Sequence, residues 1–330
     1  MTRSIAVVMP VLDDWASFAA VVADLARQFT RRELAVRLYA VDDGSLAPLA
    51  PETIDLPPAS CVVSLDIIRL ALNLGHQRAI AVGLCAVADS LDCDAVIVMD
   101  GDGEDRPRDI AALLAASGAS PGSIVLARRV KRSEPWAFRL WYQLYRLLFY
   151  VLTGQAIRFG NFSLLPLPAV RRLVYMPELW NHLAAAIMRS QLPYREVPIE
   201  RGHRIAGHSR MNLVRLIVHG LSALSVHTDL IFARVLLASA AVAAAAAAGI
   251  VVVGVIRFGT RLAVPGWATV VSGDLLIVLV QTLVVVVAAT LTMLAGRSNR
   301  PIVPILDARQ FIAVRQRRDF TRRRPAAMPA

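Results

Sequence analysis

The stretch VIVMDGDGEDRPRDI, residues 96–110, holds the pattern that decides the fold of this chain. An apolar run ends abruptly in a group of four carboxylates, Asp100, Asp102, Glu104 and Asp105. Like charges this close repel one another, so the group is stable only where water solvates it or a cation lies within it. A buried strand that leads directly into such a group predicts an open sheet with an acidic binding edge.

The first 127 residues repeat this arrangement, because short β-rich segments alternate with helical patterns. We expect strands at 5–9, 35–41, 63–68, 95–99 and 123–127. We expect helices at 15–29, 77–90 and 107–116. The alternation predicts an α/β domain with a mostly parallel sheet and helices on both faces.

Ligands of such sheets bind beyond the carboxyl ends of the strands. A second expected strand also ends in acid, in the sequence VDDGS that begins with Val41. No G-x-G-x-x-G motif follows an expected strand, which argues against a dinucleotide fold of the NAD type. The acidic edge is therefore the candidate site.

Two long apolar segments account for much of the high apolar fraction of the 330-residue chain, 56%. Residues 235–256 and 275–296 each contain 22 residues without a charge. At about 1.5 Å per residue, each helix would reach about 33 Å, enough to cross a hydrocarbon core of about 30 Å. The alternative is a pair of buried core helices.

The net charge of +11 is unevenly distributed. Residues 1–127 sum to −8, residues 128–215 to +11 and residues 297–330 to +7. Basic segments beside membrane spans face anionic lipid on the cytoplasmic side, whereas an acidic first third argues against a nucleic-acid partner. We therefore expect a multi-pass protein of the inner membrane with a cytoplasmic N-terminal domain and tail.

The three cysteines lack metal-site spacing and fit a reducing compartment.

Residues 135–153 contain seven aromatic side chains and two interrupting arginines. This pattern predicts a helix in the membrane interface, with an ordinary packing helix as the alternative. A second such helix is expected at about 209–226. The domains would then be a cytoplasmic N-terminal domain at 1–230, two transmembrane helices at 231–296 and a basic cytoplasmic tail at 297–330. Within the tail, residues 306–330 would be a solvated segment attracted to lipid.

Several motifs occur in a characteristic order: VVMPVLDDW, VDDGS, NLGHQRAIAVGL, MDGDGEDRP, GNFSLL and RGHRIAGHSRM. Together they resemble the family 2 glycosyltransferases with the GT-A fold, over roughly residues 4–296. The resemblance is strongest to the polyprenyl-phosphate glycosyltransferases, which include undecaprenyl-phosphate glucosyltransferases and dolichyl-phosphate mannose synthases. Members of that group with two C-terminal membrane helices have the architecture expected here.

The resemblance implies a role for each matching residue. The donor nucleotide-sugar would contact Pro10, Asp13, Asp42, Asn73, Gly75 and Gln77. Mg²⁺ or Mn²⁺ would bind Asp100 and Asp102. The acceptor phosphate would contact Arg128, Arg204, Ser209 and Arg210. Catalysis would then depend on Asp100, Asp102, Arg128 and Arg204.

Some of these residues also have ordinary structural explanations. Asp13 has the position of a helix cap before residue 15. Asp43 and Ser45 suit a turn, and His76 suits an exposed surface.

Three positions depart from the family pattern. Glu104 stands where Gln is common, Asn161 where Asp is common and Ser163 where Arg is common. Asn161 cannot accept a proton as a carboxylate does. A lipid phosphate is already anionic near neutral pH, so the nucleophile needs positioning more than deprotonation.

The sequence thus predicts inverting transfer of a sugar from a nucleotide-sugar, UDP-linked in preference to GDP-linked, to a polyprenyl phosphate for cell-envelope glycans. One alternative is a family 2 transferase with another acceptor, although no Trp follows an Arg as in processive synthases. The other is a non-catalytic membrane scaffold. The sugar is undetermined, and the apolar helices offer contact surface for a homo-oligomer.

Overall fold

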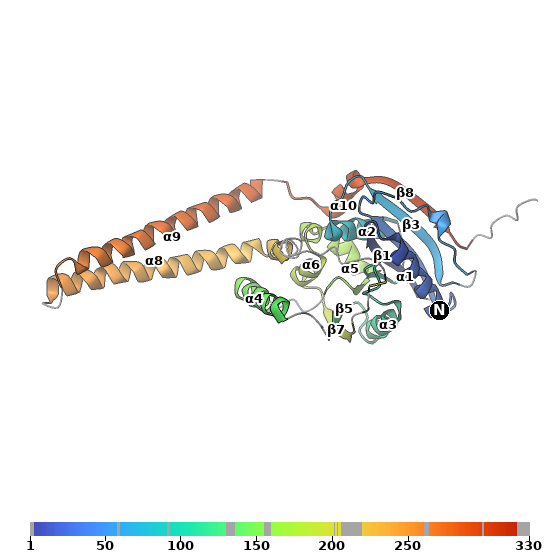
Figure 1. Cartoon of the computed structure of the whole chain (residues 1–330), viewed down its shortest axis with the longest axis horizontal. Helices are drawn as coiled ribbons and strands as arrows, with labels where there is room; N and C mark the ends of the chain where they lie inside the picture. The colour runs from blue at the N-terminus through green and yellow to red at the C-terminus, as the bar shows by residue number, and fades with distance from the viewer. Residues whose placement is uncertain are drawn as a thin grey trace, which may run out of the picture. The chain divides into compact units, whose positions relative to one another are not determined.

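The computed structural model describes residues 3–57, 60–90, 93–129, 136–154, 160–200, 202, 204–205, 220–260, 264–298 and 300–321. Contacts divide the chain into two compact units. The first comprises Met1–Arg146, Ala156–Val226 and Ile302–Ala330, and the second comprises Leu147–Gln155 and His227–Pro301. Figure 1 labels their helices and strands.

The first unit is built on a mixed sheet of eight strands. In chain order they are β1 (Arg3–Val11), β2 (Leu34–Asp42), β3 (Val62–Leu70), β4 (Ala95–Val98), β5 (Ile124–Arg129), β6 (Ser163–Pro166), β7 (Tyr194–Ile199) and β8 (Ile312–Asp319). Their order across the sheet is β7-β5-β6-β4-β1-β2-β3-β8. The central strands β4, β1, β2 and β3 are parallel, whereas β6 and β8 run antiparallel to their neighbours.

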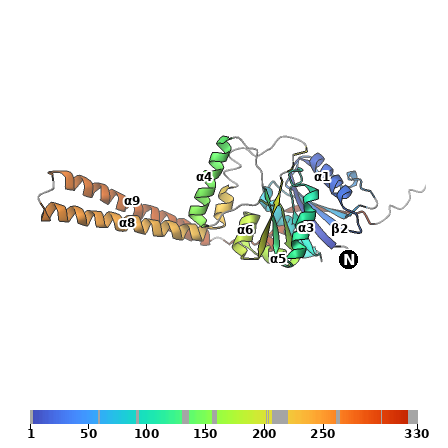
Figure 2. The ribbon, with the colours of Figure 1, turned by 90° about the horizontal axis from the view of Figure 1, so that it is seen from below.

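Helices cover both faces of the sheet (Figure 2). One face packs on α1 (Trp15–Gln28) and α3 (Ile110–Ala119), and the other on α2 (His76–Ser90), α5 (Leu167–Leu173) and α6 (Leu183–Ser190). The strands are apolar at successive positions because both faces are buried. Short turns of helix complete the unit: η1 (Pro51–Thr53), η2 (Pro107–Asp109), η3 (Pro177–Trp180), α10 (Pro304–Asp307) and η4 (Ala308–Phe311).

Strand β1 shows how the two faces are filled. Ile5, Val7 and Met9 join the core under α1, whereas Ala6 and Val8 join the core under α2. Helix α2 lies so close to β1 that a Cβ on Gly83 would overlap the side chain of Val8. The doubly covered α/β sheet expected from the sequence is confirmed.

The five expected strands and three expected helices of the first 127 residues are all present. The helix expected at 107–116 begins as the turn η2 and continues as α3. Strands β6, β7 and β8 complete the sheet from parts of the chain for which no strand was predicted.

The expectation of a solvated, lipid-attracted segment at 306–330 is wrong for residues 306–319. This segment forms the end of α10, η4 and β8, and β8 pairs with the edge strand β3. The Arg315 guanidinium lies 3.1 Å from the buried carboxylate of Asp66. The arginines of this segment were assigned to lipid because no acidic partner lies near them in the sequence. The partner of Arg315 is Asp66, 249 positions earlier.

The second unit contains two helices of 32 residues, α8 (Thr228–Gly259) and α9 (Trp267–Ser298). They lie side by side as a hairpin in both ribbon views (Figures 1 and 2). Both are long and apolar enough to cross a membrane, by length and composition. Only Ala246 and Val253 are buried in α8, and no residue is buried in α9. Buried core helices would show the opposite pattern.

The expected aromatic helix is present as α4 (Trp136–Thr153). Near its end, the Phe149 ring meets the His227 ring edge-on, with centroids 5.9 Å apart. Of the second expected interfacial helix, the structure describes only residues 220–226, of which 220–225 are helical. The remainder, including Ser209 and Arg210, lies outside the described residues.

Candidate active site

The acidic residues singled out in the sequence lie at one edge of the sheet. Strands β1, β2 and β4 are parallel, with Val11 opposite Asp42 and Val8 opposite Val98. Parallel strands bring their carboxyl ends to the same edge. Asp13, Asp42 and the segment from Asp100 to Asp105 therefore emerge side by side.

Asp42 and Asp13 form a network at the ends of β1 and β2. The Asp42 side chain is 0% exposed, and its Oδ1 accepts a hydrogen bond of 2.7 Å from Ser45 N. The Asp13 N–H donates to Ser45 Oγ (2.8 Å), and Asp13 Oδ1 accepts from Leu46 N (2.7 Å). Asp13 is thus not the cap of α1, because its carboxylate is engaged by the loop after β2.

The second carboxylate oxygen of Asp42 has an unusual environment. Oδ2 is buried, lies 3.9 Å from Arg69 Nε and has no hydrogen-bond partner in the described part of the chain. A buried acceptor without a hydrogen bond costs about 1–3 kcal/mol. The nearby Arg69 guanidinium partly balances its negative charge.

Asp43 has a different role. Its buried carboxylate accepts hydrogen bonds from Leu74 N (2.7 Å) and Gly75 N (3.0 Å), which fixes the loop before α2. Gly75 has a φ of +93°, a conformation that favours glycine. Desolvation raises the pKa of Asp43 despite these hydrogen bonds. Asp43 therefore shapes the turn, as its structural explanation predicted.

Asp100 belongs to a chain of polar contacts that the sequence did not predict. Its Oδ1 lies 3.3 Å from His76 Nε2, which in turn lies 3.0 Å from Asn161 Nδ2. Gln77 Nε2 donates to Asn161 Oδ1 (3.0 Å), and Gln77 Oε1 accepts from Leu183 N (2.8 Å). The start of α2, the segment just before β6 and the start of α6 together hold Asp100 in place.

Asp102 faces a cation of the protein itself. Arg204 Nη1 lies 3.5 Å from Asp102 Oδ2, and Arg204 Nη2 lies 2.7 Å from Asp14 Oδ2. Asp102 Oδ1 accepts from Glu104 N (3.0 Å). Desolvation raises the pKa of Asp102; the charges of Glu104 and Asp105 act in the same direction. The site therefore concentrates negative charge where water is partly excluded.

The segment that carries Arg204 docks on the acidic turn through its backbone. Gly202 N donates to Glu104 O (2.8 Å), and Ile205 N donates to Asp102 O (3.0 Å). A Cβ on Gly202 would overlap the carbonyl oxygens of Gly103 and Glu104. Glycine at 202 is thus required for this close approach.

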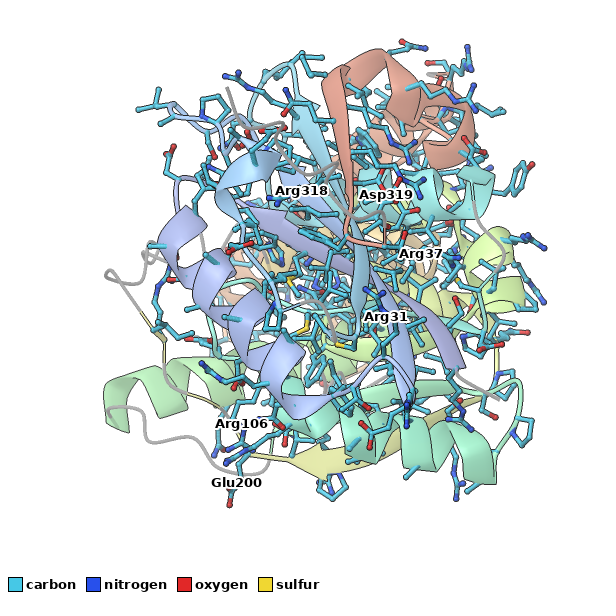
Figure 3. All side chains as sticks on the ribbon, turned by 90° about the vertical axis from the view of Figure 1, so that its right-hand side faces the viewer. Arg31, Arg37, Arg106, Glu200, Arg318 and Asp319 are labelled. Carbon is cyan, nitrogen blue, oxygen red and sulfur yellow. The ribbon has the colours of Figure 1, made fainter. Side chains whose placement is uncertain are left out.

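An ion pair closes the same region. Arg106 Nη1 lies 3.5 Å from Glu200 Oε2, and Arg106 also binds Asp109 through Nε at 2.8 Å. Figure 3 shows Arg106 and Glu200 pointing toward each other. The acidic turn and the end of β7 are therefore tied together beside the site.

Arg128 is placed apart from these contacts. Its Nε lies 3.2 Å from Glu196 Oε2, on the neighbouring strand β7. Pro10 and Asn73 lie in β1 and in the loop before α2, at the same sheet edge as Asp42.

The described residues contain no group of three or more His, Cys, Asp or Glu side chains arranged to hold a metal ion. The carboxylates that the sequence singled out at this edge are those of Asp100 and Asp102. Mg²⁺ commonly binds through one or two carboxylates and takes its remaining ligands from substrate phosphates and water. The pair fits an ion held in that way.

Residues 6–172 match the sequence model of the family described as glycosyl transferase family 2. The chain belongs to glycosyl transferase family 2. An uncharacterized glycosyltransferase of Synechocystis sp. is 23% identical over 224 residues, which cover 66% of this chain and 67% of that protein. The GT-A α/β fold expected from the motifs is confirmed.

Two solved structures also resemble this chain in fold. Glucosyl-3-phosphoglycerate synthase of Mycobacterium tuberculosis, solved with Mn²⁺, UDP-glucose and phosphoglyceric acid, has 17% identity and a TM-score of 0.49, covering 69% of this chain and 80% of its own. TarS of S. aureus has 12% identity and a TM-score of 0.44, covering 72% and 66%. The family assignment rests on the match over 6–172.

Three residues that contact the candidate site were not predicted as site residues. They are His76, Asn161 and Asp14. His76 and Asn161 stand inside motifs that the sequence did single out, NLGHQRAIAVGL and GNFSLL. Their contact joins residues 85 positions apart, so it could be identified only in the folded structure. Asp14 was hidden because its neighbour Asp13 fits the same motif.

Proposed function

We propose that this family 2 glycosyltransferase transfers a sugar from a nucleotide-sugar, UDP-linked in preference to GDP-linked, to a polyprenyl phosphate, with inversion at the anomeric carbon. The observation that carries the proposal is the meeting of Asp42, Asp100, Asp102 and Arg204 at one edge of the sheet. This arrangement offers an acceptor for a base, carboxylates for a cation and a guanidinium for phosphate.

The donor site is built from the chain's own groups as follows. Asp42 would accept an N–H of the base through Oδ2, which has no hydrogen bond in the described residues. Arg204 exchanges its contact with Asp102 for one with phosphate, because a guanidinium binds phosphate oxygens with parallel hydrogen bonds. The contacts through His76, Asn161 and Gln77 hold Asp100 in its orientation.

Asp100 and Asp102 would hold Mg²⁺ or Mn²⁺. When bound, the ion removes the repulsion between the carboxylates and stabilises the charge on the departing diphosphate.

The proposed acceptor follows from the second unit and from the charge pattern. Helices α8 and α9 have the length and composition of membrane spans, and residues 128–215 carry a net charge of +11. A phosphate on a polyprenyl chain lies at the bilayer surface, where basic side chains are attracted. We infer an inner-membrane protein with its catalytic domain and tail in the cytoplasm.

The acceptor chemistry suits the residues present. A phosphate monoester is anionic near neutral pH, so its oxygen can attack without losing a proton. Asn161 replaces the carboxylate that family members commonly carry there, and it serves here to orient His76. The reaction then depends on placing the phosphate oxygen in line with the leaving diphosphate.

The proposal is tested with the purified full-length chain in lipid nanodiscs. The assay supplies undecaprenyl phosphate and a panel of radiolabelled UDP- and GDP-sugars, with Mn²⁺ or with EDTA. We expect one donor to give a labelled lipid that disappears with EDTA. No glycolipid from any donor would contradict the acceptor assignment.

Another acceptor is the second candidate, and the departures at Asn161 and Ser163 favour it. Ser163 is buried in β6, and its hydroxyl donates to Asn161 O (2.8 Å), so it offers no positive charge to a phosphate. The same assay with soluble phosphorylated acceptors distinguishes the two. Donor binding without transfer to any acceptor would instead indicate a non-catalytic scaffold.

A further inference from the structure

We propose that strand β8, at the C-terminal side of the two long helices, forms the outer wall of the subsite that holds the nucleoside of the donor. This inference rests on the proposed function, and it assigns to the C-terminal segment a part in binding the donor.

The basis is a hollow at the carboxyl end of β2 and β3. It is lined by Gly44, Ser45, Leu46, Arg69, Leu70, Ala71, Leu72, Ala313 and Val314. The first seven belong to the family 2 domain, and the last two belong to β8. A segment near the end of the chain thus lines the same space as the loop that follows Asp42.

The hollow combines apolar side chains with directed polar groups, as a nucleoside requires. Leu46, Leu72 and Val314 are 92%, 55% and 45% exposed, so apolar surface faces solvent on several sides. Arg69 lies among them, its Nη2 donating to Ser45 O (3.4 Å) and its Nε lying 3.9 Å from Asp42 Oδ2. A planar base covers the apolar surface beside the Arg69 guanidinium.

Strand β8 also fixes the position of Arg69. Val314 is the register partner of Arg69, and Phe311 O accepts a hydrogen bond from Ala71 N (2.9 Å). The register of the pairing shifts between Arg69 and Leu70, two residues that line the hollow. The strand therefore supplies both part of the lining and the backbone support of the polar group.

Side chains anchor β8 firmly enough for this role. Arg315 binds the 1%-exposed Asp66 at 3.1 Å and lies over the ring of Tyr39. On the opposite face, Arg318 Nη1 donates to the carbonyl oxygens of Pro51 (2.9 Å) and Ile54 (2.6 Å). Figure 3 shows Arg318 and Asp319 on this strand beside β3. Strand β8 is thus held to the rest of the domain by backbone pairing and by side-chain contacts.

The test fills the hollow without removing the strand. Ala313→Trp places an indole in the lining, and Val314→Glu places a negative charge beside Arg69, its register partner on β3. Gln316→Trp is the matched control, because Gln316 is exposed on β8 and does not line the hollow. Titration calorimetry on the full-length protein measures UDP and GDP, each with Mn²⁺, and thermal unfolding verifies that each variant is folded.

We expect both hollow variants to weaken binding of the preferred nucleotide by about tenfold or more, and Gln316→Trp to bind like the wild type. Wild-type affinity in folded Ala313→Trp and Val314→Glu overturns the inference and leaves the proposed function intact. A wild-type protein that binds neither nucleotide contradicts the proposed function itself, and the inference with it. An equal loss in Gln316→Trp would also overturn it, because the effect would then belong to the strand and not to the hollow.

Discussion

Arg204 lies between two carboxylates, Asp14 and Asp102, and brings a positive charge to the acidic turn, residues 100–105. It balances charge that a ligand-bound site would balance with a divalent ion. Without such a balance, burial of Asp102 beside Glu104 and Asp105 would be costly, and the raised pKa of Asp102 reflects that cost.

Replacing Asp102 with Asn should therefore separate catalysis from folding. We expect Asp102→Asn to lower glycolipid formation by roughly 100-fold or more, because one of two carboxylates that stabilise the ion and diphosphate is lost. The melting temperature should stay near that of the wild type, since Arg204 keeps its contact with Asp14. The assay is turnover of the radiolabelled donor at saturating Mn²⁺.

Asp24→Asn is the control for that experiment, since Asp24 pairs with Arg27 on the exposed side of α1. Equal turnover in both variants would show that Asp102 has no role in the reaction.

A substitution at Gly202 tests the contact between the acidic turn and the segment that carries Arg204. Gly202→Ala should reduce turnover and weaken nucleotide binding, because its Cβ would displace the turn at Gly103 and Glu104. Gly273→Ala has open space around its Cβ and should change neither quantity. Unchanged turnover in Gly202→Ala would mean that this contact does not position the site.

The individual acidic residues were predictable because each follows a recognisable strand. The partners of these acidic residues were harder to predict. Asp100 contacts His76, 24 positions away in the sequence, and Asp102 contacts Arg204, 102 positions away. Local pattern carries no information on which of several histidines and arginines will reach a carboxylate. The fold supplies it by bringing the ends of β1, β2 and β4 to one edge.

Strand β8 is the element that differs most from the sequence-based prediction, because a tail was expected in its place. The parallel core was predictable, since apolar runs and intervening amphipathic helices mark each strand. Strand β8 has the sequence IAVRQRRD, in which no periodic apolar face stands out. It is a strand because it completes the edge of β3 and because Asp66 and two backbone carbonyls accept from its arginines.

The Arg315–Asp66 pair should contribute measurably to stability. Arg315→Ala leaves the Asp66 carboxylate buried without its partner, and we expect a loss of about 1–3 kcal/mol in the free energy of unfolding, since Arg315 is itself partly exposed. Chemical denaturation followed by near-UV circular dichroism measures this loss. Hydrogen exchange should also quicken along β8.

Arg27→Ala provides the comparison, because Arg27 forms an exposed pair with Asp24 on α1, away from Asp66. Its loss should stay within about 0.5 kcal/mol. Equal effects in the two variants would argue that Asp66 does not depend on Arg315.

The chain as a whole combines a family 2 domain with a hairpin of two apolar helices, and the domain is completed by residues on both sides of that hairpin. The hairpin was predictable from its uninterrupted apolar length. The return of the chain into the domain was not, because charge alone assigned the C-terminal arginines to lipid.

A charge in the middle of α9 tests whether the hairpin lies in a membrane. Leu283 is exposed, and Leu283→Arg should cost about 2.5–3.5 kcal/mol at the centre of a span, so less protein should resist alkaline carbonate extraction. Val264→Arg, in the connection between the helices, should leave the extracted fraction unchanged. Full retention of Leu283→Arg in the membrane pellet would contradict a lipid-facing span.

The most direct test of the account is to locate the cation at the acidic edge. Crystals of the full-length protein with UDP and Mn²⁺ give an anomalous difference map in which manganese is identified by its own scattering. We predict one strong peak within coordination distance of Asp100 or Asp102, with the diphosphate completing its shell and the base beside Asp42. Manganese and UDP bound away from these three aspartates would contradict the central claim.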